Sequence, residues 1–450
     1  MSNPTKALGQ KDIVLFCVAA ILLLDTLAAS ASIGVSAIFW WLFLGVIFFV
    51  PFGLISAELG CAYPEQGGIY VWVKKAFGKR WAARVTWSYW VNITVWAPAI
   101  FILFAGIFKQ LFWTDLSLQG QVCIGVLLTW LTVLVNCVTL DVGKWVPNIG
   151  AVLKMAIFLL LIFGAIQYVG TNGTANEISW KSLRPNLSNS LQYISVIIYG
   201  MLGFELVSAN SEQMRQPAKD VPRAILISGA IILTLYTAAT AAMLVAIPVE
   251  DINLVEGLMD TLYLFFGSTG LGGAFALFLG IGALYTFFAG GAVWAIGGNS
   301  AMAEAAQQGE FPSIFAKESL IRKTPVGSAL LFGLSSTLIL VLYGFLAGSN
   351  EDLFWSLFAF SGILFFLPYI AMSLAFVQLR RKDANHPRPY QIPGGSSVAI
   401  FIGYLCALIL TFTMTLFFYT PEDGMQWPVF LGAVALILIG EGLIYVSTKR

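Results

Sequence analysis

Three ionisable residues, Asp25, Lys154 and Glu205, lie deep within long apolar stretches of the chain. A charged side chain at the centre of a bilayer costs roughly 2.5–3.5 kcal/mol, so an ionisable residue at that depth indicates a functional site. A buried carboxylate could bind a substrate amine, and a buried lysine could exchange its proton readily. Glu58 and Glu441 lie nearer the ends of such stretches, where we expect each side chain to reach interfacial water.

Small residues interrupt the apolar stretches beside two of these charges. Asp25 is followed by "TLAASASIG", and Glu205 is preceded by Gly200 and Gly203 in "YGMLGFE". In a bilayer every backbone N–H and C=O needs a partner, so a helix break is tolerated where the freed groups face a ligand or a water-filled cavity. Half-helix ends of this kind bind carboxylates, ammonium groups and cations in transporters. The sequence therefore predicts a substrate site that includes Asp25, Thr26, Ala29, Ser30, Gly200, Gly203 and Glu205. Small residues also serve simple helix packing in membranes, which is the alternative explanation of the Ala/Ser run.

The composition places these residues in a membrane protein. Hydrophobic residues make up 58% of the 450 residues and charged residues only 10%, whereas soluble proteins carry about 25% charged residues. The apolar blocks have the length of about 20 residues that a spanning helix needs. We predict one all-α transmembrane domain over residues 1–450, with no soluble domain and twelve spans: 12–37, 39–62, 84–110, 119–140, 146–168, 190–213, 223–248, 270–303, 326–347, 353–379, 397–419 and 426–447.

The distribution of basic residues predicts the orientation of these spans. Basic residues concentrate in cytoplasmic loops, and twelve spans place both termini on one side. All but four of the 24 Lys and Arg residues lie in loops on the side of the termini, the exceptions being Lys109, Lys181, Arg184 and, within a span, Lys154. We therefore expect a multi-pass protein of the cytoplasmic membrane with both termini in the cytoplasm.

Other residue counts exclude several classes of function. The net charge of +1 gives no bulk attraction to nucleic acid. The chain has a single histidine, His386, and its five cysteines lack the spacing of metal ligands. We therefore expect no cofactor and no metal site.

Three sequence motifs resemble those of the amino acid–polyamine–organocation (APC) transporters. They are "GFELVSANSEQMRQPAKDVPRAI" from residue 203, "AELGCAYPEQGGIYVWVKKAFG" from residue 57, and the segment from "AAQQGEFPSIFAK" to "TPVGS". Together they cover most of the first nine spans, and the second motif is most similar to that of the bacterial glutamate/GABA-exchanger-like branch. The resemblance implies a LeuT-like fold: two inverted five-helix repeats, at about 12–168 and 190–379, followed by two helices at about 397–447.

The resemblance also implies roles for individual residues. Lys154 matches the lysine that replaces a bound sodium ion in sodium-independent members, where it bridges the broken first helix and the eighth. This position implies either proton symport through Lys154 or exchange with a permanently charged Lys154. Phe204 would close over the substrate as an aromatic gate, and Tyr236 and Tyr285 are further gate candidates.

One departure from the family pattern affects the expected substrate. The usual G-S-G motif of the first break is replaced by "DTLAASASIG". Asp25 could pair with a substrate amine, which favours amines or polyamines, or it could pair with Lys154 and never contact substrate. In the second case the Asp25–Lys154 ion pair would be purely structural.

We therefore expect a secondary transporter that moves amino acids or their amine derivatives by alternating access, with exchange or proton coupling and without sodium or ATP. A carrier of polyamines such as putrescine or agmatine is the alternative within transport. A polytopic membrane enzyme or a channel is the alternative of another class, but the sequence shows neither a catalytic constellation nor a selectivity filter. The expected partners are a small amino acid or amine, the lipid bilayer and, under proton coupling, protons. The sequence does not specify the oligomeric state.

Overall fold

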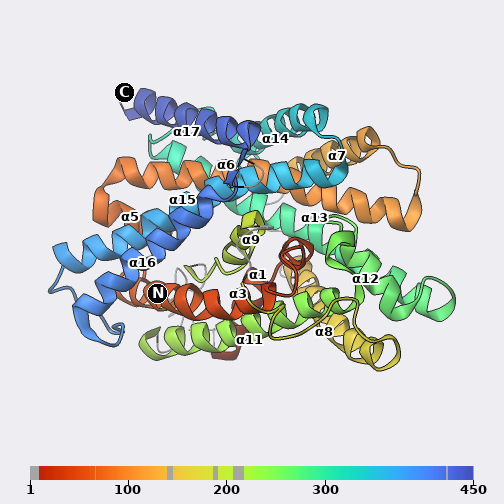
Figure 1. The fold of residues 1–450 in the computed structure, drawn as a ribbon. Coiled ribbons are helices and arrows are strands. Elements are labelled where there is room, and N and C mark those ends of the chain that lie inside the picture. Colours follow the sequence, from red (N-terminus) through yellow and green to blue (C-terminus); the bar gives the residue numbers. More distant parts are fainter. Residues whose placement is uncertain are drawn as a thin grey trace.

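The computed structural model describes residues 10–65, 67–138, 145–185, 191–205, 217–421 and 424–448. These residues form a helical bundle (Figure 1) with one antiparallel pair of two-residue strands. The helices are α1 (Gln10–Ile21), α2 (Leu27–Ala31), α3 (Ala37–Leu44), the π-helical turn η1 (Gly45–Phe49), α4 (Val50–Ala62), α5 (Ile69–Phe77), α6 (Lys79–Phe112), α7 (Leu118–Val138), α8 (Trp145–Asn172), the 3-10 turn η2 (Leu191–Tyr193), α9 (Ile194–Tyr199), α11 (Pro217–Ala246), the 3-10 turn η4 (Val249–Asp251), α12 (Gly257–Phe266), α13 (Gly270–Gln307), α14 (Val326–Leu346), α15 (Asn350–Lys382), α16 (Gly395–Thr415) and α17 (Trp427–Thr448). The strands are β1 (Tyr419–Thr420) and β2 (Gly424–Met425).

Within the described residues, ten helical segments are long and apolar enough to cross a membrane. They are Ala37–Ala62, Lys79–Phe112, Leu118–Val138, Asn148–Asn172, Lys219–Ala246, Gly270–Gln307, Val326–Leu346, Asn350–Lys382, Gly395–Thr415 and Trp427–Ser447. Each overlaps one of the spans predicted from the sequence, which confirms an all-α, multi-pass membrane protein. The two predicted spans without such a segment are the first and the sixth. The first is divided between α1 and α2, and residues 206–213 of the sixth lie outside the described residues.

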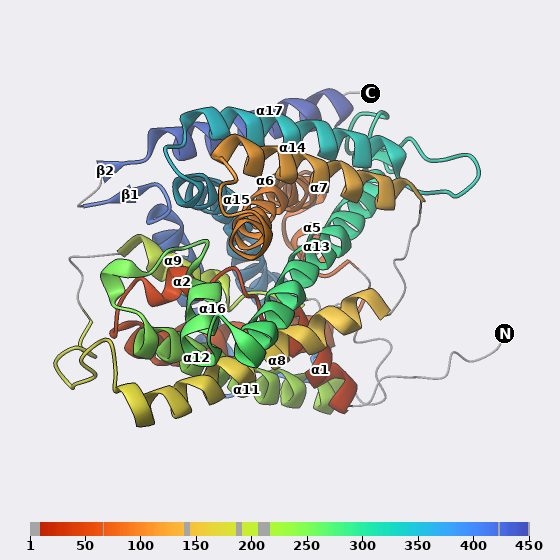
Figure 2. The same ribbon diagram turned by 90° about the vertical axis from the view of Figure 1, so that its right-hand side faces the viewer.

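Two helices form the centre of the bundle. In the most apolar part of α6, 89% of the residues are buried, and in that of α15, 78%, whereas the other eight segments reach only 22–44%. Figures 1 and 2 both place α6 and α15 between a group containing α14 and α17 and a group containing α1, α8 and α11. A helix that is buried on most of its surface is the scaffold on which polar side chains can be held away from lipid. The site described below is built mainly on these two helices.

Candidate functional site

The first interrupted helix lies where the sequence places Asp25. Helix α1 ends at Ile21, and α2 begins at Leu27 after five residues without helical structure. The freed backbone groups are bound by Tyr236 of α11, whose hydroxyl accepts a hydrogen bond from Leu23 N–H (2.7 Å) and donates one to Ile21 C=O (3.0 Å). Tyr236 is fully buried. A single side chain from another helix therefore stabilises the break.

This role of Tyr236 leads to a prediction for stability. We expect Tyr236→Phe to lower the free energy of unfolding by about 1–3 kcal/mol for each backbone group left buried without a partner. Tyr285→Phe is the matched control, because the partly exposed Tyr285 donates a single hydrogen bond, to Val146 C=O at 3.2 Å. Thermal unfolding of the two purified variants measures the difference, and equal shifts would contradict the role of Tyr236.

The second interruption follows α9. Helix α9 ends at Tyr199, and Gly203 has a φ of +127°, a conformation that side-chain-bearing residues rarely adopt. A Cβ atom on Gly203 would also lie 2.9 Å from Cγ1 of Ile21, the last residue of α1. Glycine at this position therefore lets the two interrupted segments approach each other closely.

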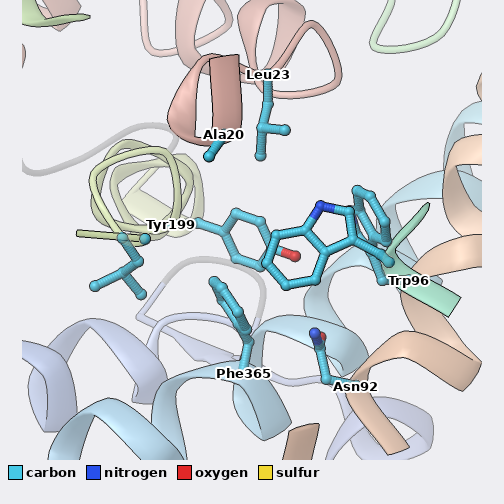
Figure 3. A pocket seen from close by; sticks show the side chains of 9 residues that line it. Ala20, Leu23, Asn92, Trp96, Tyr199 and Phe365 are labelled. Carbon is cyan, nitrogen blue, oxygen red and sulfur yellow. The ribbon is translucent and has the colours of Figure 1, made fainter. Parts of the chain in front are cut away.

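A small cavity of about 20 Å³ lies between the two interruptions. Figure 3 shows Asn92 and Phe365 pointing towards the rings of Tyr199 and Trp96, with Ala20 of α1 and Leu23 of the following segment on the opposite side. Of the described residues that line it, four have aromatic side chains and none is charged; they are Ala20, Leu23, Asn92, Trp96, Tyr199, Leu202, Gly203, Trp294 and Phe365. The faces of such rings attract cations.

Asn92 gives this aromatic cavity a hydrogen-bonding group. Its side chain is only 2% exposed, and its Oδ1 atom has no hydrogen-bond partner among the described residues. Leaving a buried acceptor unsatisfied costs about 1–3 kcal/mol. The Asn92 amide is therefore available to a ligand that offers an N–H or O–H group.

One face of α6 connects the cavity to both buried carboxylates. Tyr89, Asn92 and Trp96 share this face because they are three and four residues apart. Trp96 Nε1 donates a hydrogen bond to Asp25 Oδ2 at 3.0 Å, and Tyr89 donates one to Glu205 Oε1 at 3.3 Å. Tyr89 and Trp96 are separated by about 10 Å along the helix, so the carboxylates flank the cavity.

Helix α15 provides the second partner of Glu205. Tyr369 donates a hydrogen bond to Glu205 Oε1 at 2.8 Å, one helical turn after Phe365, which lines the cavity. Glu205 is 3% exposed, and no residue in the described part of the chain forms a hydrogen bond with its Oε2 atom. Asp25 is similarly buried, at 4% exposed, and its charge interacts with that of Lys154 on α8.

The remaining residues of the predicted site lie around these central contacts. Ser30 Oγ is 3.1 Å from Thr240 Oγ1, which also accepts a hydrogen bond from Trp41. Phe204 stacks on Phe49 with ring centroids 4.7 Å apart. Thr26 donates a hydrogen bond to Leu23 C=O, and Ala29 is buried. The side chains of Trp41 and Tyr236 lie close to Gly200. Of the predicted site residues, Gly203 lines the cavity, while Asp25 and Glu205 are one side chain away from it.

The chain resembles the amino acid permeases, whose family model matches residues 8–440. It belongs to the amino acid permease family. A protein named as a probable agmatine/putrescine antiporter from Lactococcus lactis is 32% identical over 99% of this chain and 96% of its own length. The glutamate/gamma-aminobutyrate antiporter of the same organism is 24% identical over 83% of this chain and 77% of its own length. A polyamine transporter of rice is 25% identical over 92% of this chain and 73% of its own length. The permease is therefore a transporter of the APC superfamily and not an enzyme.

Several residues that line the cavity of the permease were not predicted from the sequence, namely Asn92, Trp96, Tyr199, Trp294 and Phe365. A weak signal existed for Asn92, since it is an amide in the middle of a predicted span. No signal distinguished the four aromatic residues, because the chain contains 14 Trp, 15 Tyr and 35 Phe. Only the packing of α6, α9, α13 and α15 identifies them.

The expectation that Glu58 reaches interfacial water is wrong for this permease. Glu58 is 1% exposed, and its carboxylate contacts Arg380 at 2.5 Å and Arg388 at 3.4 Å. Glu441, in contrast, forms an ion pair with Arg84 in which about a third of each side chain is exposed. The difference arises because the segment after α15 folds back over the end of α4 and covers Glu58, which the linear sequence does not show.

Proposed function

We propose that the permease is a secondary transporter that exchanges small amine-bearing molecules by alternating access, with the aromatic cavity as its substrate site. The observation that carries this proposal is the amide oxygen of Asn92, which no described residue hydrogen-bonds, inside an aromatic cavity between two interrupted helices. Binding there would favour closure of the cavity, and the shift in population is limited by the differential affinity of the substrate for the two states.

The chemistry of the cavity favours a cationic amine. Aromatic faces, a free amide oxygen and two flanking carboxylates all attract an ammonium or guanidinium group. A substrate carboxylate would need hydrogen-bond donors at the first break, but the N–H of Leu23 is already bonded to Tyr236. We therefore assign amines of the putrescine or agmatine type as the first candidate substrates, in agreement with the name of the 32% identical relative. Amino acids are the second candidates, because the glutamate/gamma-aminobutyrate antiporter is also similar.

The architecture that accompanies this proposal has twelve membrane helices, two of them interrupted. The inverted repeats would cover about 12–168 and 190–379 of a single domain, with two further helices at about 397–447. The interruption in the first helix of each repeat supports this arrangement. The bias of Lys and Arg supports a position in the cell membrane with both termini in the cytoplasm.

Two polar contacts are suited to control access and coupling. The hydrogen bonds from Tyr89 and Tyr369 to Glu205 tie α6 and α15 to the second interruption. Their rupture would separate these elements and open one side of the cavity. Lys154, whose charge interacts with that of Asp25, would couple transport either to a proton or to obligate exchange.

Asn92→Leu tests the proposed substrate site. Leucine keeps the approximate volume but removes the amide, so a lost hydrogen bond to a charged amine should weaken binding by about 1.5–3 kcal/mol, or roughly tenfold to a hundredfold. Calorimetry with agmatine and putrescine, and counterflow of labelled putrescine in liposomes, measure the effect. Asn172→Ala, at an exposed helix end, is the control and should leave amine binding and putrescine counterflow unchanged. Unaltered affinity for every amine and amino acid in the Asn92 variant would reject the site.

A further inference from the structure

We propose that Asp25 is a positioning residue for the cavity, which acts by holding the indole of Trp96 and by connecting it to the charge of Lys154. This inference rests on the proposed function, since it takes the aromatic cavity as the substrate site. It differs from the prediction in which Asp25 itself binds the substrate amine.

The contact between Asp25 and Trp96 is the first element of the argument. Trp96 lines the cavity with its ring, whereas Asp25 does not. The indole N–H can only donate, and its partner in the structure is Asp25 Oδ2 at 3.0 Å. Both side chains are almost fully buried, at 5% and 4% exposed. Without the Asp25 carboxylate, the buried indole N–H of Trp96 would lose its hydrogen-bond acceptor.

The second element is the contact between the two indoles of the cavity. Trp96 of α6 packs edge-to-face against Trp294 of α13, with ring centroids 6.1 Å apart and an interplanar angle of 70°. Both rings line the cavity. A rotation of Trp96 therefore changes the surface offered by α6 and also removes support from the wall that α13 provides.

The third element is the charge behind Asp25. The charges of Asp25 and Lys154 interact, and a hydrogen bond accepted by an ionised carboxylate is about twice as strong as one between neutral groups. Loss or displacement of the Lys154 charge therefore changes the strength with which Asp25 holds the indole. The charge interaction between Lys154 and Asp25, together with the hydrogen bond from Trp96 to Asp25, therefore connects α8 to the cavity wall on α6 through the segment between α1 and α2.

A double-mutant cycle separates this role from direct substrate binding. Trp96→Phe keeps an aromatic wall but removes the N–H, so a residue that acts through Trp96 should lose its effect in that background. We expect Asp25→Ala to weaken binding of agmatine and putrescine at least fivefold in the wild type, but less than twofold in the Trp96→Phe protein. Asp25→Asn should stay within about threefold of the wild type, because its amide oxygen can still accept from the indole.

The binding of both probes is measured by calorimetry on the purified full-length chain, with unfolding curves to verify folding. Equal losses for Asp25→Ala in the two backgrounds, or a loss for Asp25→Asn as large as that for Asp25→Ala, would overturn the inference and make Asp25 a direct ligand. If Asp25→Ala does not fold, the Asp25→Asn variant decides, since a direct ligand would lose binding there. Saturable binding of the amines that resists Asn92→Leu would reject the proposed site, and with it this inference. Saturable binding that depends on Asn92 without coupling between Asp25 and Trp96 rejects the inference alone.

Discussion

Replacement of Glu58 by glutamine is expected to lower the free energy of unfolding by about 3–5 kcal/mol. The substitution breaks a buried ion network and leaves the two arginines of that network without a negative charge. Glu58 contacts Arg380 and Arg388 and accepts a hydrogen bond from Ile392 N–H at 2.9 Å. Glutamine can preserve the last of these contacts, but it leaves two buried guanidinium groups without their carboxylate. Chemical and thermal unfolding of the purified permease measure the loss.

Glu441→Gln is the matched control for this experiment. Glu441 also pairs with an arginine, Arg84, at 2.5 and 2.9 Å, but 32% and 38% of the two side chains are exposed. Exposed pairs contribute about 0–1 kcal/mol. If both glutamine variants lost the same stability, burial of the Glu58 network would not be the cause.

Lys154→Ala is expected to reduce counterflow of labelled putrescine at least tenfold, while Glu441→Gln reduces it less than twofold. The reason is that the substitution removes the positive charge of Lys154, which interacts with that of Asp25, a carboxylate only 4% exposed. An uncompensated buried charge is strongly unfavourable, by about 3–5 kcal/mol.

The expected rescue makes the test of Lys154 more specific. Neutralising Asp25 as well, in the Lys154→Ala/Asp25→Asn double variant, should restore the stability of the fold and part of amine binding. Similar transport losses in Lys154→Ala and Glu441→Gln would contradict the coupling role proposed for Lys154.

The contacts around Glu58 also explain how the end of α15 is fixed. Arg380 belongs to the last turn of α15, and the chain then continues to His386, whose ring stacks on Tyr63 with centroids 4.4 Å apart. Tyr63 donates a hydrogen bond to Asp383 at 3.0 Å. The segment after α15 is therefore attached to the end of α4 by ionic, aromatic and hydrogen-bonded contacts around Glu58.

The sequence by itself determined the class of the protein and the places where its helices are interrupted. Apolar blocks of spanning length identify membrane helices because the bilayer requires all backbone groups to be bonded within the segment. The same requirement makes glycine and a carboxylate in mid-span conspicuous, so the position of Asp25 and the region before Glu205 could be predicted. Ten predicted spans recur as helices, and the first is interrupted beside Asp25.

Only the tertiary structure decided which side chains form the cavity and which partners the charges have. Asn92 and Trp96 are recognisable as residues of the cavity only after α6 is placed against the interruptions after α1 and α9. Glu58 is buried because residues more than 300 positions later in the chain cover it. The physical reason is that burial and hydrogen bonding depend on contacts between distant segments, whereas helix formation in a membrane depends mainly on local composition.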